Sequence, residues 1–288
     1  MRWTRQERSN IEDRRGQKPG LPGAAKIGGG IGGIVAILLA LLLGKDYLGG
    51  GEPRGGAAQG GGAAADPDAP LRTSAAEERL VDFINFALKD QQDTWREVLG
   101  RRGQRYRETT LVLYREGTPS GCGYGDAAIG PFYCPGDGKV YVDLSFYEQL
   151  DRRFGAPGDF AQAYVLAHEV GHHIQNLLGT DDEVRRKVAQ DRRAENALSV
   201  RQELQADCYA GVWGHYAAQR ELLEPGDLDE GLAAATAIGD DALQRQAGAR
   251  VNPERWTHGS SRQRVTWFRR GFDSGDVASC DTFAATAP

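Results

Sequence analysis

The chain has 288 residues, 40% of them hydrophobic, which is enough to bury one sizeable core and to carry short appendages. Its net charge of −5 is unevenly spread, because seven Lys and Arg residues face three acids before Gly28, which gives +4 there and leaves −9 for the rest. An acidic body of this kind would repel a phosphate backbone, so nucleic acid is excluded as an expected partner.

The first predicted element is an uncharged apolar segment, residues 27–44, which follows a basic tail of residues 1–26. As a helix it would cover about 27 Å, close to the hydrocarbon thickness of a bilayer. Basic flanks favour the cytoplasmic side. The sequence therefore predicts a protein of the cell membrane with one transmembrane helix, a cytoplasmic N-terminus and an extracytoplasmic domain. A cleaved signal peptide is the alternative, but the apolar segment exceeds the usual ~7–15 residues and no Ala-x-Ala site follows it directly.

Residues 45–73 are mostly Gly, Ala and Pro, a composition typical of a disordered linker. The folded domain is expected over residues 74–288. Ser74 is a predicted N-cap with Glu77 as its capping-box partner, and apolar side chains at helical spacing follow as far as Leu99.

Further along, the sequence predicts two strands and three helices. The strands are Thr109–Tyr114 and the alternating segment Lys139–Leu144. A short helix is predicted to open with a capping box at Ser145, and two long helices are predicted over Asp159–Leu178 and about Glu195–Gln219. The expected fold class is α+β, mainly helical with a few strands, preceded by the transmembrane helix.

The most informative motif is His168-Glu169-Val170-Gly171-His172, inside the first long helix. Histidines four residues apart project from nearly the same side of a helix, so both can reach one metal ion. Glu169 lies at the edge of that face, where a base could deprotonate a metal-bound water. Such a pattern should arise by chance in roughly one chain of this length per hundred. The motif predicts a hydrolytic Zn²⁺ site.

The second long helix offers a third ligand. Glu203 and Asp207 are four residues apart and share a face. Glu203 could complete the metal site, while Asp207 could accept the remaining ring N–H of His168 and so fix its tautomer. A solvated acidic stripe is the alternative, but the upstream histidines favour the metal site.

With these motifs the chain resembles zinc peptidases of the gluzincin type. More narrowly, it resembles the bacterial "putative neutral zinc metallopeptidase" family, whose members carry an N-terminal membrane anchor. The blocks that carry this resemblance are Glu12–Gly16, Cys122–Gly123, Gly130–Pro135, Val140–Asp143, Thr257–Ser261 and Cys280–Phe283. The resemblance implies a zincin-like domain in which His168, His172 and Glu203 bind zinc. It also implies that Glu169 is the catalytic base and that the substrate is a polypeptide.

In peptidases of this type an edge strand commonly aligns the substrate. Lys139–Leu144 is the candidate, with an ordinary internal strand as the alternative. His258 is a candidate stabiliser of the oxyanion, with a structural role in its loop as the alternative. His173 is displaced by about 100° from His172 on the helix, so it should miss the metal.

The four cysteines form no C-x-x-C pair, which argues against a structural zinc site. An even number in an extracytoplasmic domain predicts disulfides. Three pairings are possible, and the favoured one joins Cys122 to Cys134 and Cys208 to Cys280. Free buried thiols in a cytosolic protein are the alternative.

Together these patterns predict a membrane-anchored zinc peptidase that hydrolyses peptide bonds with a zinc-activated water and Glu169 as general base. One alternative is a catalytically inactive, zinc-stabilised, membrane-tethered binding or scaffold protein. Another is a different metal-assisted hydrolysis by the same ligands. Intact Glu169 favours chemistry, because a purely structural site has no need for a base. The oligomeric state does not follow from the sequence.

Overall fold

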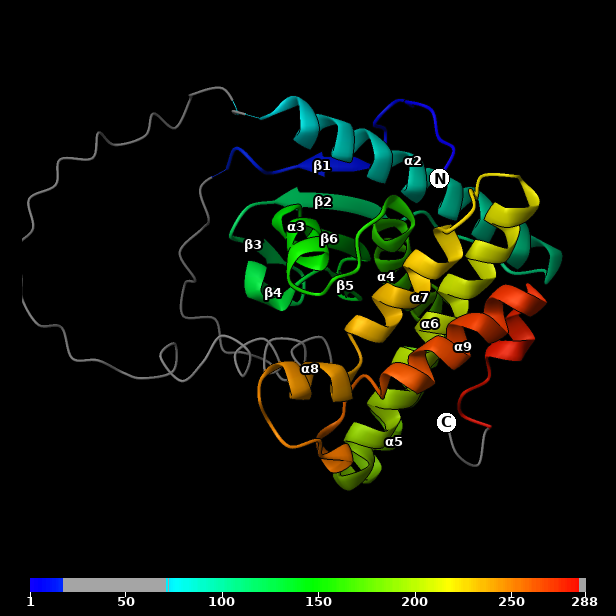
Figure 1. Ribbon diagram of the computed structural model, residues 1–288. Helices are drawn as coiled ribbons and strands as arrows, with labels where there is room; N and C mark the ends of the chain where they lie inside the picture. The colour runs from blue at the N-terminus through cyan, green and yellow to red at the C-terminus, as the bar shows by residue number, and fades with distance from the viewer. Residues whose placement is uncertain (18–70, 72, 285–288) are drawn as a thin grey trace, which may run out of the picture.

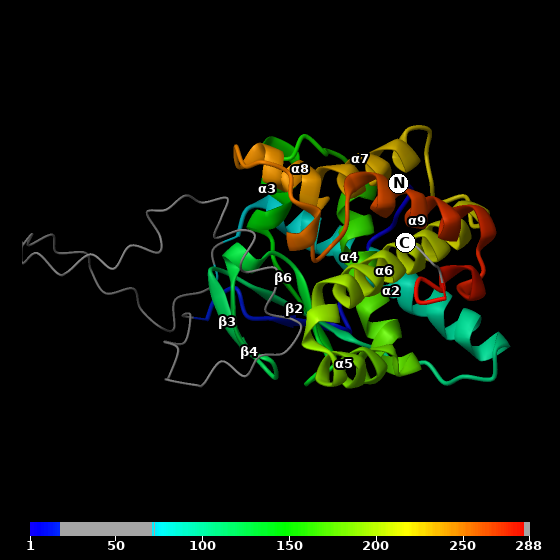
Figure 2. The ribbon, with the colours of Figure 1, turned by 90° about the horizontal axis from the view of Figure 1, so that it is seen from below.

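The strands lie together on one side of the molecule and most of the helices lie on the other (Figure 1). Seen from below, α9 (Ser261–Ser274) lies on the side of the molecule away from the strands (Figure 2). This computed structural model describes residues 1–17, 71 and 73–284. The mainly helical α+β class predicted for the domain agrees with this architecture.

The main sheet has four strands in the order β1-β2-β6-β5. They are β1 (Ile11–Asp13), β2 (Thr110–Tyr114), β6 (Lys139–Asp143) and β5 (Phe132–Cys134). β1, β2 and β6 are parallel, with Val112 opposite Tyr141, and β5 is antiparallel to β6. Apolar side chains fill both faces of β2, as is usual where a parallel sheet is covered on both sides.

The position of β6 corrects one expectation. Lys139–Leu144 was the candidate edge strand, but β6 lies between β2 and β5 and both of its edges are paired. Among the described strands, β5 is the edge strand on that side of the sheet.

A second, two-stranded sheet joins β3 (Gly117–Ser120) to β4 (Gly123–Asp126). The Cys122–Cys134 disulfide ties this hairpin to β5, with the two Cα atoms 5.7 Å apart. It thereby fixes a short hairpin that has few apolar side chains to bury.

The four helices predicted for the domain begin and end near the expected residues. They are α2 (Ala75–Arg101), α3 (Ser145–Arg152), α4 (Asp159–Leu178) and α6 (Glu195–Gln219). Four further helices were not predicted: α5 (Thr180–Gln190), α7 (Asp227–Ala237), α8 (Asp240–Gln246) and α9 (Ser261–Ser274). Ser74 caps α2 as predicted, because its Oγ accepts the Glu77 N–H at 3.0 Å. The capping box predicted at Ser145 is wrong: this residue is already helical, and Asp143 accepts its N–H at 2.9 Å.

The helical core is built around α4, α6 and α9. α6 and α9 cross so closely that a Cβ on Gly271 would lie 1.9 Å from the carbonyl oxygen of Cys208. Only glycine fits at that crossing. The Cys208–Cys280 disulfide then fastens the segment after α9 to the middle of α6.

Residues 1–17, which the sequence analysis assigned to a separate cytoplasmic tail, lie against the domain. β1 pairs with β2, and Trp3 packs against Phe83 of α2 with ring centroids 5.6 Å apart. Arg15, whose side chain is only 1% exposed, forms ion pairs with Asp13, Glu77 and Glu78. Arg5, Arg8 and Arg15, three of the cations that suggested membrane orientation, thus form ion pairs with acids of α2.

The predicted fold class needs a correction in its N-terminal part. Within residues 1–17, 71 and 73–284, none of the helices combines the length and the apolar character that crossing a membrane requires. The segment predicted as the transmembrane helix, residues 27–44, lies outside the described residues, as does most of the predicted linker. The architecture that the structure supports is a mostly helical α+β domain.

Candidate metal centre

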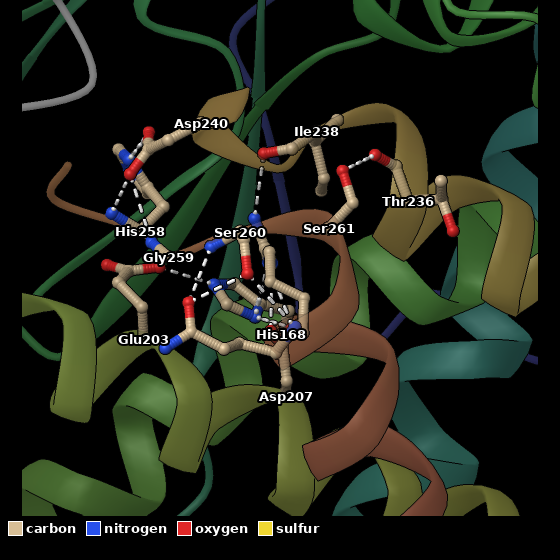
Figure 3. A network of polar contacts seen from close by, with 12 residues as sticks. His168, Glu203, Asp207, Thr236, Ile238, Asp240, His258, Gly259, Ser260 and Ser261 are labelled. Carbon is tan, nitrogen blue, oxygen red and sulfur yellow. Dashed lines mark hydrogen bonds and ion pairs between the residues drawn. The ribbon is translucent and has the colours of Figure 1, made fainter. Parts of the chain in front are cut away.

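Two neighbouring helices bring the three predicted ligands together. His168 and His172 project from α4 and Glu203 projects from α6. The His168 Nε2 atom lies 3.0 Å from Glu203 Oε2, and His172 Nε2 lies 3.5 Å from Glu203 Oε1. Figure 3 shows Glu203 between His168 on one side and His258 on the other.

These distances fit a zinc ion. A tetrahedral ion about 2.0–2.1 Å from each ligand atom holds its ligands about 3.3 Å apart. The two nitrogen–oxygen distances, 3.0 and 3.5 Å, lie on either side of that value. Two imidazoles and one carboxylate are also the donor set of hydrolytic zinc sites, which keep a fourth position for solvent.

The glycine inside the histidine motif sets the spacing between the two helices. A Cβ on Gly171 would lie 2.9 Å from the Ala206 carbonyl oxygen and 3.0 Å from the Ala206 Cα. Backbone cannot yield as a flexible side chain can, so any larger residue would push α4 away from α6. Gly171 therefore lets the ligands of the two helices meet.

Buried charges orient His168. Its Nδ1–H donates to Asp207 Oδ1 at 2.9 Å, which leaves the Nε2 lone pair facing Glu203. Asp207 also accepts from the Tyr164 hydroxyl at 2.6 Å and from Arg264 Nε and Nη2 at 2.8 and 2.9 Å. Arg264 and His168 outweigh the effect of burial and lower the pKa of Asp207 to about 2. Asp207 thus stays ionised as the partner of the imidazole.

An amide orients the second histidine. The Nδ1 atom of His172 lies 2.9 Å from Gln175 Oε1, one turn further along α4. The Nε2 atom again faces Glu203. His173 lies elsewhere: its Nε2–H donates to the Arg107 carbonyl at 2.6 Å and its Nδ1 accepts from the Tyr133 hydroxyl at 3.0 Å.

The charges at this centre favour a cation beside Glu203. Burial opposes ionisation of Glu203, yet His172 and His258 outweigh it and hold the pKa of the carboxyl well below its usual range. Burial likewise opposes the imidazolium of His172, yet the Glu203 charge outweighs it and raises the pKa of His172 to about 10. Without metal, a proton supplies the positive charge that a Zn²⁺ ion would supply.

Glu169 is buried next to the ligands, with 8% of its surface exposed. Burial raises the pKa of its carboxyl, while the two ligand histidines and the backbone N–H of Tyr133 in β5 oppose that effect. The charge of Glu169 also adds to burial in raising the pKa of Tyr147, whose hydroxyl has no hydrogen-bond partner among the described residues. A carboxylate in such surroundings is a good proton acceptor.

His258 lies on the α6 side of this centre. Asp240 accepts the backbone N–H of His258 at 2.7 Å, and its other oxygen lies 3.3 Å from the His258 Nδ1. Asp240 also accepts the N–H groups of Thr257 and Gly259 at 2.7 and 3.0 Å, which fixes the loop (Figure 3). The structure therefore shows the loop contacts of His258, and Figure 3 shows this residue beside Glu203.

Sequence reasoning missed four residues of this environment. Tyr164 and Gln175 stand one turn before His168 and one turn after His172, so the helical period of the motif offered a signal for both. Tyr147 lies on α3, the helix before the one that carries the motif, and Arg264 lies 57 residues after Asp207. Neither has a local pattern that marks its role.

The fold and the centre together define a mostly helical α+β domain in which two histidines and one carboxylate form a candidate metal site beside a buried glutamate. Over residues 1–283 the chain matches the family described as "Putative neutral zinc metallopeptidase", and it belongs to that family. It is 47% identical over 294 aligned residues to the uncharacterized protein YpfJ of Escherichia coli (strain K12), covering 98% of this chain and 99% of the relative. It is 40% identical over 264 residues to an uncharacterized protein, Rv2575, of Mycobacterium tuberculosis (strain H37Rv), covering 85% of each. No solved structure matches the chain significantly.

Proposed function

We propose that this protein is a zinc-dependent peptidase that hydrolyses peptide bonds in polypeptides. The observation that carries the proposal is the meeting of His168, His172 and Glu203, whose ligand atoms all lie within 4.8 Å of one another, beside buried Glu169. Membership of a family described as zinc metallopeptidases supports the same reaction class. A bound Zn²⁺ would supply Lewis-acid chemistry, lowering the pKa of water to about 7 and polarising the scissile carbonyl.

In this proposal Glu169 takes a proton from the attacking water and later delivers it to the leaving amine. Burial raises the pKa of this carboxyl, which favours the first of these steps, the acceptance of a proton. A purely structural site would gain nothing from a second buried carboxylate next to its ligands, and burying one is costly. This argument favours hydrolysis over a scaffold role.

His258 is the proposed stabiliser of the developing oxyanion. Asp240 and Thr257 both contact its Nδ1 atom, at 3.3 and 3.0 Å, and so orient the ring. The Nε2 edge is then available to a substrate group beside Glu203. Removing one donor of this kind typically slows turnover by about 100-fold or more.

The two disulfides support a location outside the reducing cytoplasm. They tie the hairpin to β5 and the C-terminal segment to α6, the helix that carries Glu203. The polypeptide substrate is the proposed partner.

The test uses purified protein loaded with Zn²⁺ and an unfolded, carboxymethylated protein as substrate. Glu169→Gln is expected to abolish cleavage and to keep the parent's zinc content, whereas His258→Gln should retain zinc and lose about 100-fold in rate. Glu148→Gln, a change at an exposed position of α3, is the matched control and should cleave like the parent. Cleavage by Glu169→Gln at the parental rate would refute the assignment of the base.

A further inference from the structure

A chain of buried amide hydrogen bonds connects His172 to the Cys208–Cys280 disulfide. The His172 Nδ1 atom lies 2.9 Å from Gln175 Oε1. Gln175 Nε2 donates to Gln205 Oε1 at 3.1 Å, and Gln205 Nε2 donates to the carbonyl oxygen of Cys280 at 3.0 Å. Gln175 is fully buried and Gln205 is 6% exposed, so water has little access to these groups.

Two backbone carbonyl oxygens, those of Cys280 and Gln202, fix the direction of the hydrogen bonds in this chain. The Cys280 carbonyl can only accept, so Gln205 must present its NH₂ group there and its oxygen to Gln175. Gln175 then donates to Gln205 and, at 2.6 Å, to the Gln202 carbonyl. Its own oxygen therefore faces His172, whose Nδ1 must carry the hydrogen.

This direction matters for metal binding. An imidazole with its hydrogen on Nδ1 keeps the Nε2 lone pair free, and Nε2 is the atom that faces Glu203. If either glutamine turned its amide over, two oxygens or two NH₂ groups would face each other in a buried site. Such a mismatch leaves polar groups unpaired, which costs about 1–3 kcal/mol each.

The carbonyl at the end of the chain is held by a covalent bond. Cys280 belongs to the short 3₁₀ segment Val277–Cys280, and its sulfur is bonded to Cys208 of α6. Cys208 follows Asp207, the partner of His168, directly in the sequence. Two consecutive residues of α6 therefore support the two histidines. Asp207 supports His168 through its carboxylate, and Cys208 supports His172 through the disulfide and the amides of Gln205 and Gln175.

We propose that Gln175 and Gln205 are positioning residues for His172, and that the Cys208–Cys280 disulfide strengthens Zn²⁺ binding by fixing the Cys280 carbonyl at the end of their hydrogen-bond chain. This inference rests on the metal site of the proposed function. It adds to that function a covalent support for His172, the Cys208–Cys280 disulfide, which acts through Gln205 and Gln175.

The first experiment measures Zn²⁺ affinity by competition with a chromophoric chelator. Gln175→Leu and Gln205→Leu are each expected to weaken zinc binding by about 10-fold or more, as is typical when a group that orients a ligand is lost. Gln91→Leu is the matched control, because Gln91 is fully buried and donates to the Ala163 carbonyl of α4 at 3.1 Å without touching a ligand. It should bind zinc within about two-fold of the parent. Parental affinity in Gln205→Leu would overturn the proposal.

The second experiment tests the disulfide through a double-mutant cycle. The paired change Cys208→Ala with Cys280→Ala should weaken zinc binding in the parent background but have little further effect in Gln175→Leu, because the chain is already broken there. Additive losses would show that the disulfide acts by another route and would overturn its part of the proposal.

Two further results separate the proposal from folding defects and from the peptidase assignment. Urea unfolding of the metal-free variants controls for folding, because Gln91→Leu removes a buried amide of the same size. A loss of zinc affinity confined to Gln175→Leu and Gln205→Leu supports the positioning role, and an equal loss in Gln91→Leu would contradict it. A parent protein that binds zinc and cleaves no polypeptide would refute the proposed function and leave these affinity comparisons valid. A parent that cleaves while Gln205→Leu keeps parental affinity would refute the positioning role alone.

Discussion

The buried pair Asp207–Arg264 gives the sharpest prediction of stability. Asp207 is fully buried and Arg264 is 2% exposed, and two hydrogen bonds of 2.8 and 2.9 Å join them. Removing one partner of such a pair leaves an uncompensated buried charge and typically costs about 3–5 kcal/mol. We expect Asp207→Asn and Arg264→Met each to lower the free energy of unfolding by that amount, which is a large part of the stability of an ordinary domain.

Replacing both partners should cost much less than the sum of the two single changes. In Asp207→Asn combined with Arg264→Met no buried charge is left over, and the Met side chain keeps most of the apolar stem of Arg264. The assay is urea unfolding of chelator-treated protein, followed by tryptophan fluorescence at neutral pH. Single variants within about 1 kcal/mol of the parent, or additive losses in the double variant, would refute this reasoning.

Two other predictions concern the spacing between α4 and α6 and the loss of stability at low pH. Gly171→Ala should push α4 from α6 through its contact with Ala206 and reduce Zn²⁺ affinity by at least about 10-fold; a zinc titration that matches the parent would contradict the spacing argument. Arg15 outweighs burial and lowers the pKa of Asp13, and a hydrogen bond from Arg8 lowers that of Glu78. Because these folded-state pKa values lie below the unfolded ones, their contribution is present above about pH 4 and is lost as the pH falls further. Urea unfolding at pH 6 and pH 3.5 should therefore show a larger loss in the parent than in Arg15→Gln, and equal losses would contradict this assignment.

The sequence predicted the local part of the candidate centre well. Helical periodicity and the stop signal at Gly179, which adopts φ 81°, located α4 and placed His168 and His172 on one face. The same reasoning put Glu203 and Asp207 together on α6. These inferences succeeded because the spacing of ligands on a helix depends only on residues a turn apart.

Long-range partners were beyond sequence reasoning. Arg264 reaches Asp207 from another helix, and the support of His172 depends on a carbonyl 75 residues after Gln205. No pattern of composition or period marks such contacts, because they arise only when α6, α9 and the C-terminal segment pack. The internal position of β6 was missed for a similar reason, since the three-residue β5 is too short to give a strand pattern.

The contacts of residues 1–17 with the domain were not predicted, because charge is the main feature of this segment that the sequence shows. Its arginines satisfied the rule for cytoplasmic flanks, while β1 is three residues long and pairs with a strand about a hundred residues later in the chain. These arginines form ion pairs with three acids of α2: Glu77, Glu78 and Asp82. In the sequence those acids resemble the exposed first turns of an ordinary helix.

The pairing of β1 with β2 has a consequence for how this protein matures. β1 is synthesised long before β2, so this edge strand of the sheet can pair only after the part of the domain that contains β2 has been made. It follows that the sheet and the charge balance of α2 are complete only when residues 1–17 lie against the domain. A domain that folded without these residues would have an unpaired strand edge on β2 and acidic side chains on α2 without their arginine partners.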